Sequence, residues 1–81
     1  MSTFPERLIT LQTERKLLKK DIASAVNISV MAYYRYEKGL RQPDLLLLNA
    51  LADYFNVSLD YLTGRSDDAT PPKRNDAKDG E

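Results

Sequence analysis

The chain has 81 residues, with 12 basic and 12 acidic side chains and a formal net charge of zero at pH 7. That length suits one small domain. Because the sequence contains no cysteine and no histidine, it excludes disulfides, thiolate metal sites and the commonest general base. We therefore expect a protein that is not an enzyme and that uses no metal and no cofactor.

Apolar residues at helical spacing predict two short helices in the first part of the chain. Thr3 or Ser2 can cap the first helix, and the second lies within residues 17–26, "LLKKDIASAV", before Asn27. The expected inner residues of the two helices are Phe4, Leu8, Leu11, Ile22, Ala23 and Val26.

Three further helices each follow a residue that can cap a helix N-terminus, namely Ser29, Asp44 and Ser58. We expect the third helix to end at Gly39 and the fifth to end at Gly64, because glycine readily adopts the left-handed conformation. The expected inner face of the fourth helix is Leu45, Leu48, Leu51, Ala52 and Phe55.

The last part of the chain, residues 66–81, differs in composition. It has no large apolar residue, two prolines and dense mixed charge, so we expect a disordered tail. We therefore predict an all-α fold, a compact five-helix bundle over residues 1–65 followed by this tail. The chain has neither an apolar run of about 18 residues nor a signal-peptide pattern, so we expect no membrane contact and a cytoplasmic location.

The charges are unevenly distributed, with seven basic and two acidic residues between Arg15 and Arg41. A locally basic segment can bind a polyanion even when the whole chain is neutral. The second and third predicted helices lie in this segment and are joined by about three residues, Asn27 to Ser29. Two short helices joined by a tight turn are typical of a helix-turn-helix, in which the second helix enters the DNA major groove.

The run "DIASAVNISVMAYYRYEKGLRQPDLLLLNALADYFNVSLDYLTGR" resembles the phage-repressor-like helix-turn-helix family of lambda repressor, Cro and XRE proteins. The residues that carry the resemblance are Ala23, Ile28, Ser29, Tyr36, Glu37, Gly39 and Pro43, with "LADYFNVSLDYLTGR" close to the family's usual ending. The resemblance implies a bacterial or phage-encoded, nucleoid-associated regulator. Such a protein is most often a repressor that binds palindromic operator DNA as a homodimer.

Several positions depart from the family pattern. Lys19 stands where the family usually has a glutamine that touches the DNA backbone, and Lys16 replaces a glycine before the second helix. The family often places a basic residue on the first helix to pair with the glutamate that matches Glu37. Here that position is Gln12, so we expect a neutral hydrogen bond or no pair.

A helical wheel divides the third helix into two faces. Tyr33 and Tyr36 point inward with Ala32, as the matching family positions usually do. The opposite face is the expected base-reading surface and comprises Val30, Met31, Tyr34 and Arg35. Arg35 can donate two hydrogen bonds to guanine. Val30 and Met31 can contact thymine methyl groups, and an exposed apolar pair is equally compatible with a protein contact.

The expected phosphate contacts are Lys19, Lys20, Ser29, Lys38 and Arg41. Four adjacent leucines cannot all face one core, so part of the "LLLL" run is expected at a surface. Family dimers commonly meet near the fifth helix, and the candidates for a dimer interface are Leu46, Leu47, Leu59 and Tyr61. The alternative function is a helix-turn-helix used as a protein-interaction module, such as an antirepressor, an adaptor or an antitoxin.

Overall fold

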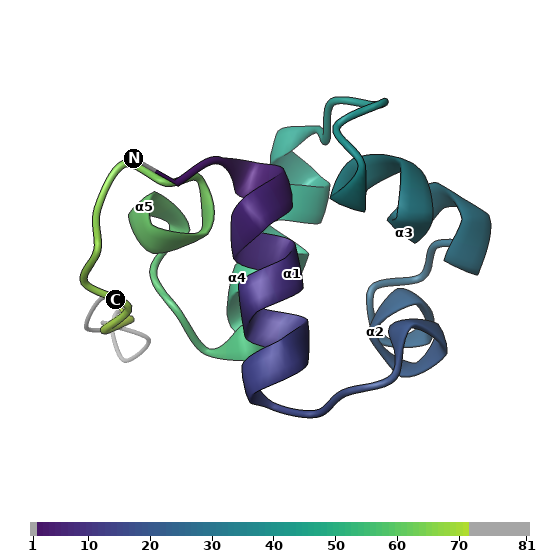
Figure 1. The fold of residues 1–81 in the computed structure, drawn as a ribbon, viewed down its shortest axis with the longest axis horizontal. Coiled ribbons are helices and arrows are strands. Elements are labelled where there is room, and N and C mark those ends of the chain that lie inside the picture. The colour runs from purple at the N-terminus through teal and green to yellow at the C-terminus, as the bar shows by residue number, and fades with distance from the viewer. Residues whose placement is uncertain (1, 72–81) are drawn as a thin grey trace, which may run out of the picture.

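The computed structural model describes residues 2–71, which form five α-helices and no strand. The helices are α1 (Phe4–Glu14), α2 (Lys19–Ala25), α3 (Val30–Glu37), α4 (Leu45–Phe55) and α5 (Leu59–Leu62). Helix α1 crosses the middle of the molecule, with α2 and α3 on one side and α5 on the other (Figure 1). The predicted all-α, five-helix fold is confirmed. No helix in this part of the chain has the length and apolar character needed to cross a membrane.

Four of the five helices begin with a side-chain cap, and these four caps agree with the prediction. The side chains of Thr3, Ser29, Asp44 and Ser58 each accept a hydrogen bond from a backbone N–H in the first turn. Helix α2 is the exception, because Leu18 occupies the cap position and its side chain forms no such bond. The start of α2 therefore depends on contacts with the rest of the bundle.

Each of the five helices is followed, one or two residues after its end, by a residue with a left-handed backbone. These residues are Lys16, Asn27, Gly39, Asn56 and Gly64. The next residue then donates its N–H back to the helix, as Leu17 N–H does to Gln12 O at 3.1 Å. Glycine and asparagine tolerate this conformation, whereas Lys16 (φ 54°) carries a Cβ that makes it unfavourable.

The core contains residues from every helix and from the loop between α4 and α5. Its buried apolar residues are Leu8, Leu11, Ile22, Ala23, Tyr33, Tyr36, Leu47, Leu51, Ala52, Phe55, Val57, Tyr61 and Leu62. The predicted inward position of Leu45 is wrong, because its side chain is exposed. Leu47, Leu51 and Phe55, spaced four apart, form the inner stripe of α4, and Leu45 lies two residues out of that register.

Residues 66–71 lie at the start of the segment for which we predicted a disordered tail, and in the structure they contact the bundle. Arg7 of α1 pairs with the Asp67 carboxylate at 2.7 Å and donates a hydrogen bond to Ser66 O at 3.1 Å. The Arg7 guanidinium also lies 3.9 Å from the centre of the Tyr61 ring. Ser58 N–H donates to Ala69 O at 3.1 Å. The remainder of the predicted tail, 72–81, lies outside the described residues.

Candidate nucleic-acid interface

The connection between α2 and α3 fixes the direction of α3. Asn27 adopts a left-handed backbone (φ 61°), which lets Ile28 N–H donate to Ala23 O at 2.9 Å. Ile28 then packs partly buried against the core, and Ser29 Oγ accepts a hydrogen bond from Ala32 N–H at 3.0 Å. The turn is thus held by backbone bonds on one side and by a side-chain cap on the other.

Helix α3 has the two faces that the wheel predicts. Tyr33 and Tyr36 are buried in the core and anchor the helix to the bundle. On the opposite face, Val30, Met31 and Tyr34 are exposed and together line a shallow apolar hollow. Arg35 is exposed beside this hollow, and no hydrogen bond or ion pair within residues 2–71 engages its guanidinium. Its donors are therefore available to an outside acceptor.

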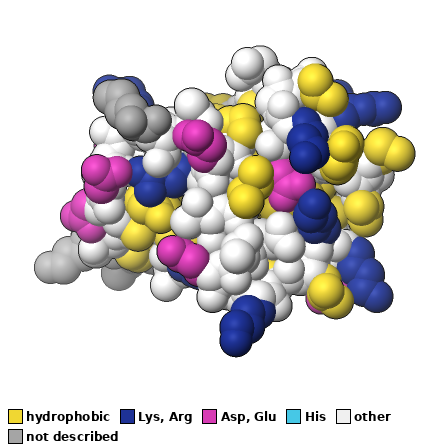
Figure 2. Space-filling view, viewed as in Figure 1, with side chains coloured by type: hydrophobic (Ala, Val, Ile, Leu, Met, Phe, Trp, Pro, Cys, Tyr) yellow, Lys and Arg dark blue, Asp and Glu magenta, His cyan; other side chains and the backbone are white. Residues whose placement is uncertain are grey.

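Two lysine ammonium groups, those of Lys19 and Lys38, lie near the Tyr34 ring on this exposed face. Lys20, Lys38 and Arg41 are exposed, and the Lys38 ammonium lies 5.4 Å from the centre of the Tyr34 ring. Lys and Arg side chains and hydrophobic side chains gather over the end that carries α2 and α3, whereas most Asp and Glu on the same face lie over the end that carries α5 (Figure 2). An apolar and cationic surface of this kind suits the floor of a DNA groove and its flanking phosphates.

Lys19 differs from Lys20 and Lys38 because its ammonium forms an ion pair with another described residue. Its ammonium pairs with the Glu37 carboxylate at 2.8 Å, while Gln12 donates instead to Leu17 O at 3.1 Å. The Gln12–Glu37 hydrogen bond that we considered is therefore absent, and Lys19 is the partner of Glu37. Sequence reasoning missed this pair because the two residues are 18 apart in the chain, and the apolar pattern gives no signal for it.

The Tyr33 hydroxyl is buried without a hydrogen-bond partner among the described residues. Burial raises the pKa of Tyr33 well above its usual value near 10, and the negative charge of Glu37 raises it further. The phenol is therefore neutral at physiological pH and contributes packing rather than charge.

The four candidate dimer residues lie in different surroundings. Leu46 is 81% exposed and is free to contact a second copy, but Leu47 is only 8% exposed and packs in the core. Tyr61 is also buried, beneath the Arg7 guanidinium, and Leu59 is half-buried. Leu47, which we named as a candidate for the dimer interface, therefore has little surface available to a second copy, because its side chain continues the buried Leu51–Phe55 stripe.

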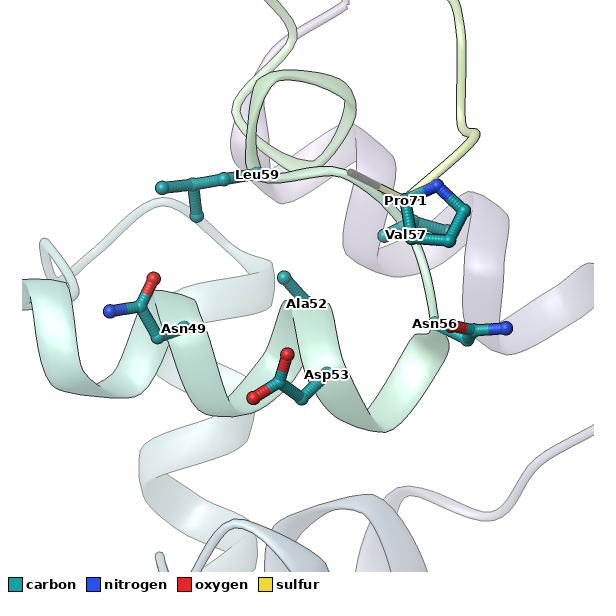
Figure 3. A pocket seen from close by; sticks show the side chains of 7 residues that line it. All are labelled: Asn49, Ala52, Asp53, Asn56, Val57, Leu59 and Pro71. Atoms are coloured by element: carbon teal, nitrogen blue, oxygen red, sulfur yellow. The ribbon is translucent and has the colours of Figure 1, made fainter. Parts of the chain in front are cut away.

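A separate groove of about 320 Å³ lies between α4, the start of α5 and Pro71 (Figure 3). Its lining among residues 2–71 contains the amides of Asn49 and Asn56 and the Asp53 carboxylate and no lysine or arginine, so these residues do not favour a phosphate. The described residues contain no group of carboxylates that could hold a metal ion.

Comparison with known proteins gives consistent results. The helix-turn-helix family model matches residues 11–62. The chain is 37% identical over 59 residues to the HTH-type transcriptional regulator YqaE of Bacillus subtilis strain 168, covering 73% of this chain and 51% of that protein. It is 28% identical over 64 residues to the cryptic phage CTXphi transcriptional repressor RstR of Vibrio cholerae, covering 79% of this chain and 58% of that protein. The chain thus spans little more than half the length of these relatives.

Solved structures show the same fold. The crystal structure of a transcriptional regulator from Listeria innocua superimposes with a TM-score of 0.73 at 35% identity, covering 76% of this chain and 58% of that chain. The P22 c2 repressor protein, crystallised in complex with synthetic operator 9T, superimposes with a TM-score of 0.75 at 23% identity, covering 82% of this chain and all of that chain. At the latter identity the likeness shows the fold alone.

Proposed function

Because this chain belongs to the helix-turn-helix family, we propose that it is a transcriptional regulator that binds double-stranded DNA in a sequence-specific way, and that it acts by binding and not by catalysis. The observation that carries the proposal is the outer face of α3. There, Arg35, which has no partner among the described residues, and an apolar hollow are presented together on a helix whose other face is anchored by two buried tyrosines.

The exposed residues divide into two roles. Arg35 donates to guanine O6 and N7 in the major groove, a contact worth roughly 1–3 kcal/mol of discrimination between bases. Val30 and Met31 contact thymine methyl groups, and the Tyr34 hydroxyl reaches a phosphate or a base edge. The phosphates are held by Lys20, Lys38 and Arg41, and by the hydroxyl of Ser29, which can donate a hydrogen bond while it caps α3.

The simplest biological role is a repressor in the cytoplasm, beside the nucleoid, that occupies an operator and excludes polymerase. The names of its relatives support this role, since one is a phage transcriptional repressor. A two-fold dimer would place two copies of α3 on a palindromic site, about one helical turn apart. Leu46 and Leu59 remain the candidates with surface available for that dimer.

The salt dependence of duplex binding tests the proposal. Three phosphate-binding cations on each copy of a dimer predict an affinity loss of about 10³-fold between roughly 50 and 200 mM salt. Fluorescence anisotropy with a labelled mixed-sequence duplex measures this loss. An affinity that does not change across that salt range, or no binding at low salt, would contradict the proposal.

A second candidate function is a protein-interaction module, and one observation favours it. Leu40, Leu45 and Leu46 are all exposed in the loop after α3 and the first turn of α4. Large apolar side chains exposed so near one another in the sequence favour a surface that binds proteins. In that case Val30 and Met31 would contact a protein, and the duplex experiment above would give no binding.

A further inference from the structure

We propose that Lys19 is a positioning residue, which holds the recognition helix α3 in place by neutralising Glu37, and that it does not contact DNA phosphates. The inference rests on the proposed DNA-binding function and assigns a residue to it. A lysine at this position, in the first turn of the helix before the recognition helix, otherwise predicts a phosphate contact.

The environment of Glu37 gives the first reason. Its side chain is only 4% exposed at the C-terminal end of α3, and Lys19 is the only cation paired with it in the described part of the chain. A buried carboxylate without a partner is strongly unfavourable, so the pair cannot open without a large cost. A DNA phosphate that captured the Lys19 ammonium would leave Glu37 with that uncompensated charge.

The position of Lys19 in α2 gives the second reason. Lys19 is the first residue of α2, where the helix dipole disfavours a cation. Helix α2 is also the helix that lacks a side-chain N-cap, because Leu18 stands at its cap position. The Lys19–Glu37 pair offsets the unfavourable interaction of the Lys19 cation with the helix dipole. It also links this uncapped end of α2 directly to α3.

The surroundings of the ammonium give the third reason. The Lys19 side chain is 41% exposed, and its ammonium lies 6.0 Å from the centre of the Tyr34 ring on the outer face of α3. The pair thus reaches the edge of the base-reading surface. Its loss would shift α3 and change which bases are preferred, whereas the loss of a phosphate contact weakens all sequences alike.

The matched control is Lys20, the exposed neighbour of Lys19 in the same turn. Duplexes are selected from a random pool with the wild type, and the affinity of the selected duplex and of a scrambled duplex is measured at several salt concentrations. All variants are measured at a temperature where circular dichroism shows them to be fully folded. We expect Lys20→Met to reduce the salt slope by about 0.9 per copy and to leave the ratio of the two affinities unchanged.

For Lys19→Met we expect the opposite result, with the salt slope unchanged and the ratio of the two affinities reduced. Lys19→Arg should restore the ratio, because arginine can also pair with Glu37. A fall in salt slope equal to that of Lys20→Met, with an unchanged ratio, would overturn the inference.

Protein stability provides an independent readout that does not depend on DNA. Urea unfolding of Lys19→Met should show an unfolding equilibrium constant raised roughly ten- to a hundredfold, and the added change Glu37→Gln should recover much of that loss. If the two single changes prove additive, the ion pair has no energetic role and the inference fails. If the wild type selects no duplex, the proposed function fails, while this stability comparison still decides whether Lys19 and Glu37 are coupled.

Discussion

Replacing Lys16 with glycine should stabilise the protein. Lys16 has a φ of 54° at the end of α1, where a residue with a Cβ costs roughly 1–2 kcal/mol relative to the right-handed conformation. Glycine removes that cost, but it loses more backbone freedom on folding, and this entropy loss destabilises the folded state by about 0.5–1 kcal/mol. The Lys16 side chain is exposed, so its removal sacrifices no buried contact.

The net gain is therefore about 0.5–1 kcal/mol in the free energy of unfolding. For a domain of this size it corresponds to a rise in Tm of about 2–8 °C, which thermal unfolding followed by circular dichroism resolves. The matched control is Lys20→Gly, the same chemical change at an exposed position with helical backbone, which should cost about 0.5–1 kcal/mol. A Lys16→Gly variant that is less stable than the wild type would refute the reasoning about the left-handed backbone.

Further predictions concern residues whose surroundings the structure defines. Tyr33→Phe keeps the buried ring and removes a hydroxyl that has no hydrogen-bond partner among the described residues. The variant should therefore be as stable as the wild type or more stable, with a gain of at most about 1–3 kcal/mol in urea unfolding at pH 7. Because burial raises the pKa of Tyr33, the folded state favours the neutral phenol. The wild type should therefore lose stability above about pH 10, and the variant should lose less. Arg7→Ala should cost about 2 kcal/mol through loss of its contact with the Tyr61 ring, whereas Asp67→Ala at the exposed end of the pair should cost less than about 1 kcal/mol. Leu46→Lys should change the free energy of unfolding by less than about 0.5 kcal/mol, and Leu47→Lys should cost roughly 2–5 kcal/mol; a dimer in sedimentation that survives Leu46→Lys would remove Leu46 from the interface.

Most of the helix starts were predictable because their signals are local. Ser29, Asp44 and Ser58 are capping residues next to apolar runs, and each caps the helix that follows it. The helix ends at Gly39 and Gly64 follow from the freedom of glycine at positive φ. The two faces of α3 were likewise predictable, since helical periodicity separates Tyr33 and Tyr36 from the exposed side.

The details that were not predictable depend on tertiary contacts. In α4 the leucine run is compatible with more than one register, and the contacts of Leu47 with the core select the one that exposes Leu45. The partner of Glu37 is likewise determined by how α2 packs against α3, which brings Lys19 within 2.8 Å of it. The contacts of Arg7 with Ser66 and Asp67 were not predictable either, because the composition of residues 66–71 gave no indication that they contact α1.

Selection of duplexes from a random pool tests the central claim most directly, because it measures whether α3 reads a sequence. The wild type should recover a palindromic site with half-sites about one helical turn apart, and Arg35→Ala should lose preference at one base pair in each half-site. A wild type that enriches no sequence would contradict DNA recognition by this fold. An unchanged preference in Arg35→Ala would contradict the role given to the outer face of α3.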